Sequence, residues 1–248
     1  MKPYALTFLA LVALTCVALV SAQTPDAKPA APAPKLAGKV TGKLVYDGKV
    51  PVVPPLEIGA DKSPGCGEHV STQDPALIVD EHGGIANAVV TVAVPGARVE
   101  VPAEPLLIDQ RGCRFDPHVL VAPLGSKLRF ANSDACTHNV HTYPRKSDPI
   151  NKAMATGGHE ELVLAQKETV QVRCDYHPWM SCWVFVTDTP YWAVTASDGS
   201  FAITGLAPGA YKAELWHEQL GKLKFDVTVG ADGNAQVGEL KLARKPAK

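Results

Sequence analysis

Short runs in which polar and apolar residues alternate fill most of the chain after residue 38, and no helical repeat persists for three turns. Gly, Pro, Asn and Asp separate these runs, and residues 48–76 have no clear period and are expected to form a loop. Alternation with turns at short intervals is typical of β-sandwiches and barrels. The sequence therefore predicts an all-β fold. The expected strands are 39–46, 85–94, 118–122, 126–131, 139–143, 161–165, 168–174, 182–187, 191–195, 200–204, 210–216, 222–229 and 235–242.

Residues 1–22 have the pattern of a secretory signal peptide, with Lys2 at the start, an apolar centre and a small-residue end at Ser21-Ala22. A lipoprotein signal would use Cys16, but the apolar run continues past it. Residues 23–37 are rich in Pro and Ala and are expected to form an extended linker. No later stretch is apolar for long enough to cross a membrane. We therefore expect a periplasmic or secreted mature chain without a membrane span.

The composition allows a sizeable core and excludes one class of partner. The 248 residues are 46% hydrophobic, so one or two domains are expected. The net charge of −1 gives no hint of nucleic acid or of an anionic membrane surface, and no nucleic-acid partner is expected.

Residues 174–180 place a thiol, an imidazole and a thioether at the spacing Cys-x2-His-x2-Met. Alternation in the preceding strand points Cys174 inward, and the following loop is short enough for the three side chains to converge. Together they suit a soft metal, copper above all. Taken alone, an exported cysteine is more often half of a disulfide. Zinc fits less well, because the chain has no Cys-x2-Cys pair and Met is a poor zinc ligand.

A second imidazole lies upstream, where a strand ending at Asn132 leads through a short turn to His138-Asn139-Val140. This run resembles the first-histidine loop of cupredoxins. The 174–180 run is similar to their closing ligand loop, most closely that of amicyanin. The segment 115–126 also resembles the second strand and turn of that family. The resemblance covers residues 105–187, and it implies a cupredoxin Greek-key β-sandwich over this part of the chain.

The resemblance further implies one type 1 copper ion. Its ligands would be His138, Cys174 and His177, with Met180 as a weak axial ligand. Asn139 resembles the family's asparagine that ties the two ligand loops together.

Several residues near the expected ligands are harder to assign. Asp175 and Tyr176 depart from the Ser or Thr and the Pro of many relatives. His118 and His141 are candidates for an additional metal contact. The competing interpretation of His141 is an exposed or core histidine, since it falls on the other face of a regular strand from His138.

The last segment, residues 188–245, resembles carboxypeptidase-regulatory-like and transthyretin-like β-sandwich modules, with turns at Asp198-Gly199 and Pro208-Gly209. The resemblance implies a second, small β-sandwich. About five strands are few for a closed two-sheet core. We therefore expect strands from the N-terminal segment 38–104 to complete this sandwich, with the 105–187 unit inserted between them.

The function expected from these features is an exported type 1 copper protein that carries one electron to or from a redox partner protein that the sequence does not identify. The alternative is a copper-handling protein of the cell envelope that stores, delivers or senses copper. Such proteins tend to have Met-rich or His-rich open sites, and the mature chain keeps only Met154 and Met180. No enzyme activity is expected, because the His-x-His and His-Cys-His clusters of multicopper enzymes are missing from the sequence.

The expected mature chain has an odd number of cysteines: Cys66, Cys113, Cys136, Cys174 and Cys182. With Cys174 reserved for copper, four remain and allow three pairings. Cys136 and Cys182 each lie two residues from an expected ligand, which favours a Cys136–Cys182 bridge and leaves Cys66–Cys113. Alternatively, Cys136 and Cys182 are free buried thiols.

Overall fold

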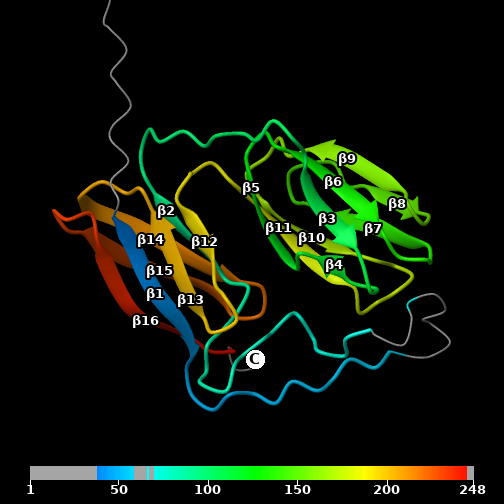
Figure 1. Cartoon of the computed structure of the whole chain (residues 1–248), viewed down its shortest axis with the longest axis horizontal. Coiled ribbons are helices and arrows are strands. Elements are labelled where there is room, and N and C mark those ends of the chain that lie inside the picture. The colour runs from blue at the N-terminus through cyan, green and yellow to red at the C-terminus, as the bar shows by residue number, and fades with distance from the viewer. Residues whose placement is uncertain (1–37, 59–65, 67–69, 245–248) are drawn as a thin grey trace, which may run out of the picture. The chain divides into compact units, whose positions relative to one another are not determined.

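A computed structural model of the protein describes residues 38–58, Cys66 and residues 70–244. The expected signal peptide 1–22 and the linker 23–37 lie outside these residues. The described residues form strands and no helices, as Figure 1 shows, so the prediction of an all-β fold is confirmed. Nowhere in the described ranges does a helix have the length and apolarity needed to cross a membrane.

Sixteen strands follow one another along the described chain. They are β1 (Lys39–Tyr46), β2 (Val89–Ala93), β3 (Leu106–Gln110), β4 (Phe115–Asp116), β5 (Val119–Pro123), β6 (Lys127–Asn132), β7 (His138–Tyr143), β8 (Asn151–Met154), β9 (His159–Val163), β10 (Thr169–Arg173), β11 (Ser181–Thr187), β12 (Trp192–Val194), β13 (Ser200–Thr204), β14 (Gly209–His217), β15 (Gly221–Val229) and β16 (Ala235–Leu242).

The first sandwich combines the earliest described strands with the last ones. One sheet has the order β13-β1-β16 and the other has the order β12-β2-β14-β15 (Figure 1). Strand β1 runs antiparallel to β13 and parallel to β16, while β2 is antiparallel to both β12 and β14. One buried core lies between the sheets and includes Leu44, Ile85, Val90, Phe201 and Leu215. Residues 38–104 therefore contribute the central strand of one sheet and an inner strand of the other.

The turn at Asp198-Gly199 packs closely against β1. Gly199 has a φ of +79°, and a Cβ on it would lie 2.2 Å from the carbonyl oxygen of Leu44. The carbonyl oxygen of Gly199 in turn accepts a hydrogen bond of 2.8 Å from the Leu44 N–H. Only glycine fits here, because a side chain would meet both the positive φ and the backbone of β1.

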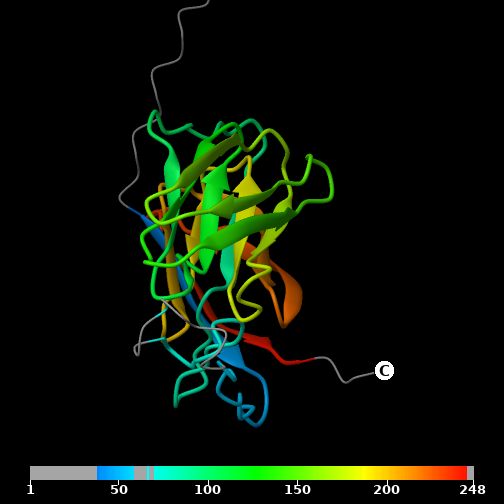
Figure 2. The same cartoon turned by 90° about the vertical axis from the view of Figure 1, so that its right-hand side faces the viewer.

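Strands β3 to β11 form the second sandwich. Its sheets have the orders β5-β11-β10-β7-β8 and β4-β3-β6-β9 (Figures 1 and 2). Alternation buries Leu128 and Phe130 of β6 against Val170 and Val172 of β10, inside a second core. The strand β10 therefore ends with its inward face pointing into this core, at the point where Cys174 follows.

A third buried cluster packs β5 and β11 against β2 and β14. Its buried members are Val89, Val119, Val121 and Trp216. The indole ring of Trp183 meets that of Trp216 edge to face, with 5.3 Å between the ring centroids. The two sandwiches are thus joined by packed aromatic and aliphatic side chains, which contribute burial energy of their own.

His217, at the end of β14, should make the protein less stable in mild acid. Burial lowers its pKa to about 4, whereas the unfolded chain keeps a value near 6.5. The unfolded form thus binds a proton that the folded form excludes. The contribution of neutral His217 to stability is therefore fully present above about pH 6.5 and is lost as the pH drops toward 4. We expect a loss of about 2 kcal/mol in the unfolding free energy of the metal-free protein between pH 7 and pH 5.

Urea unfolding at the two pH values measures this loss. His217→Gln should show a smaller loss, because the variant has no group that titrates at this position. An equal loss in the wild type and in the variant would contradict the assignment to His217.

Candidate metal centre

The loop after β10 brings Cys174, His177 and Met180 to one end of the second sandwich. Cys174 continues the inward alternation of Val170 and Val172 and is 2% exposed. The Met180 N–H donates to the His177 carbonyl oxygen at 2.9 Å, and the Cys174 N–H donates to the Met180 carbonyl oxygen at 3.2 Å. These bonds close a tight turn. Met180, the last residue of this turn, is wholly buried.

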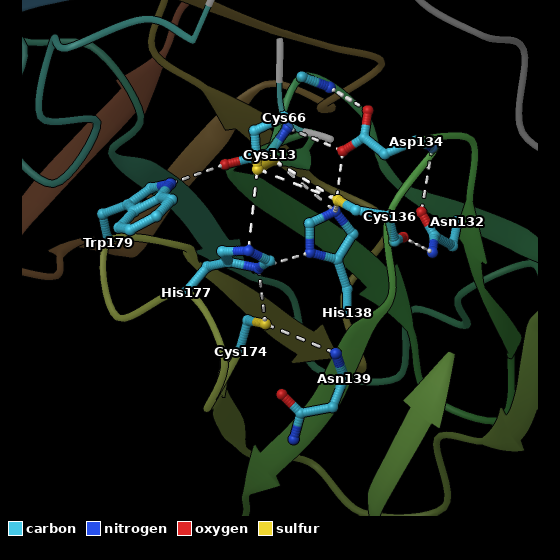
Figure 3. Close-up of a disulfide and its surroundings, with 11 residues drawn as sticks. Cys66, Cys113, Asn132, Asp134, Cys136, His138, Asn139, Cys174, His177 and Trp179 are labelled. Atoms are coloured by element: carbon cyan, nitrogen blue, oxygen red, sulfur yellow. Dashed lines mark hydrogen bonds and ion pairs between the residues drawn. A yellow bond between two sulfur atoms is a disulfide. The ribbon is translucent and has the colours of Figure 1, made fainter. Parts of the chain in front are cut away.

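Three potential ligand atoms converge in the core beside this turn. His138 is the first residue of β7 and is wholly buried. Its Nδ1 lies 2.8 Å from Nδ1 of His177, which lies 3.6 Å from Sγ of Cys174. The ligand atoms of these three residues all lie within 4.8 Å of one another, and Figure 3 shows the His177 ring between the thiol of Cys174 and the ring of His138.

The donor set fits a copper ion. Burial raises the pKa of the Cys174 thiol, so a thiolate here requires a cation to offset its desolvation. A thiolate with two imidazole nitrogens, at a place shielded from water, matches the preference of copper rather than that of a hard cation.

Asp134 orients His138 from its far side. The Asp134 carboxylate lies 2.9 Å from Nε2 of His138 and also accepts hydrogen bonds from the N–H groups of Gly112 and Cys113, at 2.6 and 2.8 Å. An ionised carboxylate only accepts hydrogen bonds, so Nε2 carries the hydrogen and Nδ1, which faces Nδ1 of His177, keeps its lone pair. The sequence reasoning missed Asp134, because it lies in a bend with no periodic pattern.

Asn139 connects the two ligand segments. Its side-chain oxygen accepts a hydrogen bond of 2.5 Å from the Asp175 N–H, and its side-chain nitrogen donates to the Asp175 carboxylate at 3.0 Å. Its backbone N–H lies 3.5 Å from Sγ of Cys174. These contacts fix His138 and Cys174 relative to each other.

Similarity to known proteins is confined to parts of the chain. Residues 181–237, from β11 to β16, match the family described as polysaccharide lyase family 4, domain II. No curated protein matches the sequence. The matched family covers less than half of the chain. No family is thereby assigned.

Three solved structures show a partial likeness to this chain. The copper-containing nitrite reductase NirK of Thermus scotoductus SA-01 is 23% identical, with a TM-score of 0.33, over 39% of this chain and 25% of that chain. A purple cupredoxin of Nitrosopumilus maritimus is 22% identical over 33% of this chain and 99% of its own, with a TM-score of 0.30. A mutant of amicyanin in its Cu(I) form is 20% identical over 40% of this chain and 98% of its own, with a TM-score of 0.33. At these scores the likenesses support no conclusion about function.

His141 lies outside the convergent group. Its Nδ1 is 3.0 Å from the Asp175 carboxylate and 3.0 Å from the Tyr143 hydroxyl. Hydrogen bonding to His141 is the main cause that lowers the pKa of Asp175. His141 joins none of the possible metal-binding groups among the described residues. Asp175 thereby links His141 to Asn139.

His118 has partners other than a metal. Its Nδ1 lies 3.0 Å from the Ser181 carbonyl oxygen, and its Nε2 pairs with the carboxylate of Glu218. Both side chains of this pair are largely buried. His118 therefore connects β11 to the turn after β14, and it too is outside every possible metal-binding group of the described chain.

The cysteines follow the predicted pairing only in part. Cys66 and Cys113 form a disulfide with Cα atoms 5.4 Å apart. The predicted Cys136–Cys182 bridge is wrong, since both thiols are free. The prediction assumed an extended chain at Cys136, but residues 134–136 form a bend that turns the thiol toward the disulfide. Cys182 stays inside the second core, where burial raises the pKa of its thiol well above the ordinary value.

Proposed function

We propose that the protein is an exported type 1 copper protein that carries one electron at a time. The observation that carries the proposal is the buried convergence of Cys174 Sγ with the Nδ1 atoms of His138 and His177. The expected signal peptide supports a periplasmic or secreted location, and a partner protein would supply or accept the electron.

In this proposal His138, Cys174 and His177 hold the ion, and Met180 completes the set as a weak axial ligand. Copper would supply a one-electron couple. The protein holds the ligands in place through Asp134 on one imidazole and through the hydrogen bonds of Asn139 across the two ligand segments. Ligands held in this way need to move little when the charge of the site changes, which favours rapid electron transfer.

The alternative function is copper storage, delivery or sensing. A site that hands over copper needs ligands that a second protein can reach. Here His138 is fully buried and His177 is 6% exposed. The burial of both imidazoles therefore favours the electron carrier.

Reduction of the copper-loaded protein in the presence of a chromogenic Cu(I) chelator separates the two functions. An electron carrier retains its copper, and reoxidation restores its absorption spectrum over repeated cycles. Transfer of the copper to the chelator on the time scale of reduction would contradict the electron-carrier proposal and support the copper-handling alternative.

Met180→Leu should keep a coloured copper site and raise its reduction potential. The axial thioether is a weak ligand, so its loss leaves the other three donors in place. If the substitution lowers the affinity for Cu(II) tenfold and leaves the affinity for Cu(I) unchanged, the potential rises by about 59 mV, which voltammetry resolves.

Met154→Leu is the matched control for this substitution. Met154 is also a buried methionine, but its sulfur accepts a hydrogen bond from Gln110 on β3. The potential of this variant should stay at the wild-type value. Loss of all copper from the Met180→Leu protein would refute weak axial ligation by Met180.

A further inference from the structure

Three cysteine sulfurs meet on the far side of the two imidazoles. The Cys66–Cys113 disulfide lies beside the free thiol of Cys136, whose Sγ is 4.0 Å from Sγ of Cys66 and 3.9 Å from Sγ of Cys113. Cys66 comes from the segment between β1 and β2, Cys113 from the turn between β3 and β4, and Cys136 from the bend before β7. The proposed electron carrier uses none of these sulfurs.

Each imidazole lies between this sulfur cluster and Cys174. Nε2 of His138 is 3.4 Å from Sγ of Cys136, and Nε2 of His177 is 3.8 Å from Sγ of Cys66, as Figure 3 shows. The Nδ1 atoms of the same rings face each other beside Cys174. The ligand atoms of Cys66, Cys113, Cys136 and His177 also lie within 4.8 Å of one another.

We infer that Cys66, Cys113 and Cys136 form a second soft-metal site, for Cu(I), when the disulfide is reduced by a dithiol. The dithiol supplies two electrons and two protons, the Cys66–Cys113 bond breaks to give two thiols, and the dithiol becomes a disulfide. Three thiols then surround one point, and Cu(I) replaces their protons as it binds. Thiolates select Cu(I) among the copper oxidation states.

The second site follows from the sulfur geometry and does not require that Cys174 bind copper. Because of this site, the number of copper ions that the chain binds depends on whether a dithiol in its surroundings has opened the Cys66–Cys113 disulfide. With the disulfide closed, Cys136 is a single thiol next to two bonded sulfurs, and the cluster offers too few free thiolates for a Cu(I) site. With the disulfide open, the capacity rises by one ion.

Counting of bound Cu(I) tests the inference on the full chain. The protein is reduced with excess dithiothreitol, desalted under argon and titrated with Cu(I) against a chromogenic chelator, beside an untreated sample. We expect two ions per chain after reduction and one without it. In reduced Cys136→Ser the cluster should bind its ion more weakly than in the reduced wild type, because the variant keeps only two of the three thiols. Cys182→Ala, which removes a free thiol outside the cluster, should still bind two after reduction.

Three outcomes would overturn the inference: the same ion count in the reduced and the untreated wild type, equally tight binding of the added ion by reduced Cys136→Ser and by the reduced wild type, or tighter binding of Zn(II) than of Cu(I) by the reduced cluster. The wild-type count decides the question even if a variant folds poorly. Failure of the electron-carrier proposal gives a different result. In that case Cu(II) produces no visible thiolate band, while reduced Cys174→Ser still binds one Cu(I) at the cluster.

Discussion

Cys174→Ser should abolish the visible absorption of the Cu(II)-loaded protein while the fold is kept. The thiolate is the proposed chromophore, and a serine hydroxyl does not ionise at neutral pH to replace it. Loss of a residue outside the ligand set of a metal site costs about 10–100-fold in affinity, and loss of this ligand should cost more. Absorption spectra and Cu(II) titrations measure both effects, and circular dichroism reports the fold.

Cys182→Ala is the matched control, because Cys182 is also a free buried thiol of the second sandwich. It lies on β11 within the core and outside the convergent group. This variant should keep the wild-type band and affinity. A band that survives in Cys174→Ser, or that disappears in Cys182→Ala, would place the copper thiolate elsewhere.

Residues 188–248 alone should not fold. Without β1 the strands β13 and β16 have no common neighbour, and without β2 the strands β12 and β14 are separated. The fragment also lacks the buried side chains Leu44, Ile85 and Val90. Each such side chain contributes about 1.5–3 kcal/mol, and the net stability of a whole domain is only about 5–15 kcal/mol. Circular dichroism and urea titration should show no cooperative unfolding transition.

A chain that joins residues 38–104 to 188–248 through a short Gly/Ser linker is the positive control. It restores both missing strands and should unfold cooperatively. The domain limits expected from sequence remain predictions until such chains are compared. Cooperative unfolding of the 188–248 fragment by itself would show that the N-terminal strands are dispensable.

The strand pattern could be predicted wherever apolar residues alternate cleanly. The bounds expected for 39–46, 200–204 and 235–242 match β1, β13 and β16. Three strands were missed. In β3 the alternation breaks because Asp109 and Gln110 are buried beside Ile108, and β4 has only two residues. The sequence Asn-Lys-Ala-Met of β8 has low β-propensity, and only its pairing with β7 makes it a strand.

The convergence of His138, Cys174 and His177 could be anticipated from two short loops, because loop length limits where the side chains can go. The sulfur cluster could not be anticipated from the sequence. It depends on a bend at Cys136 and on the position of Cys66 beside Cys113, and neither cysteine lies in a stretch with a periodic signal in the sequence. Asp134 was missed for the same reason. Its role rests on contacts with the turn at Gly112 and Cys113, which come from a separate part of the chain.

The absorption spectrum of the wild-type protein with one equivalent of Cu(II) tests the central claim most directly. We expect an intense visible band from charge transfer between the Cys174 thiolate and Cu(II). One electron per copper should bleach the band, and oxidation should restore it. A colourless Cu(II) complex, in a protein that binds Cu(I) tightly, would contradict the type 1 site and the electron-carrier function.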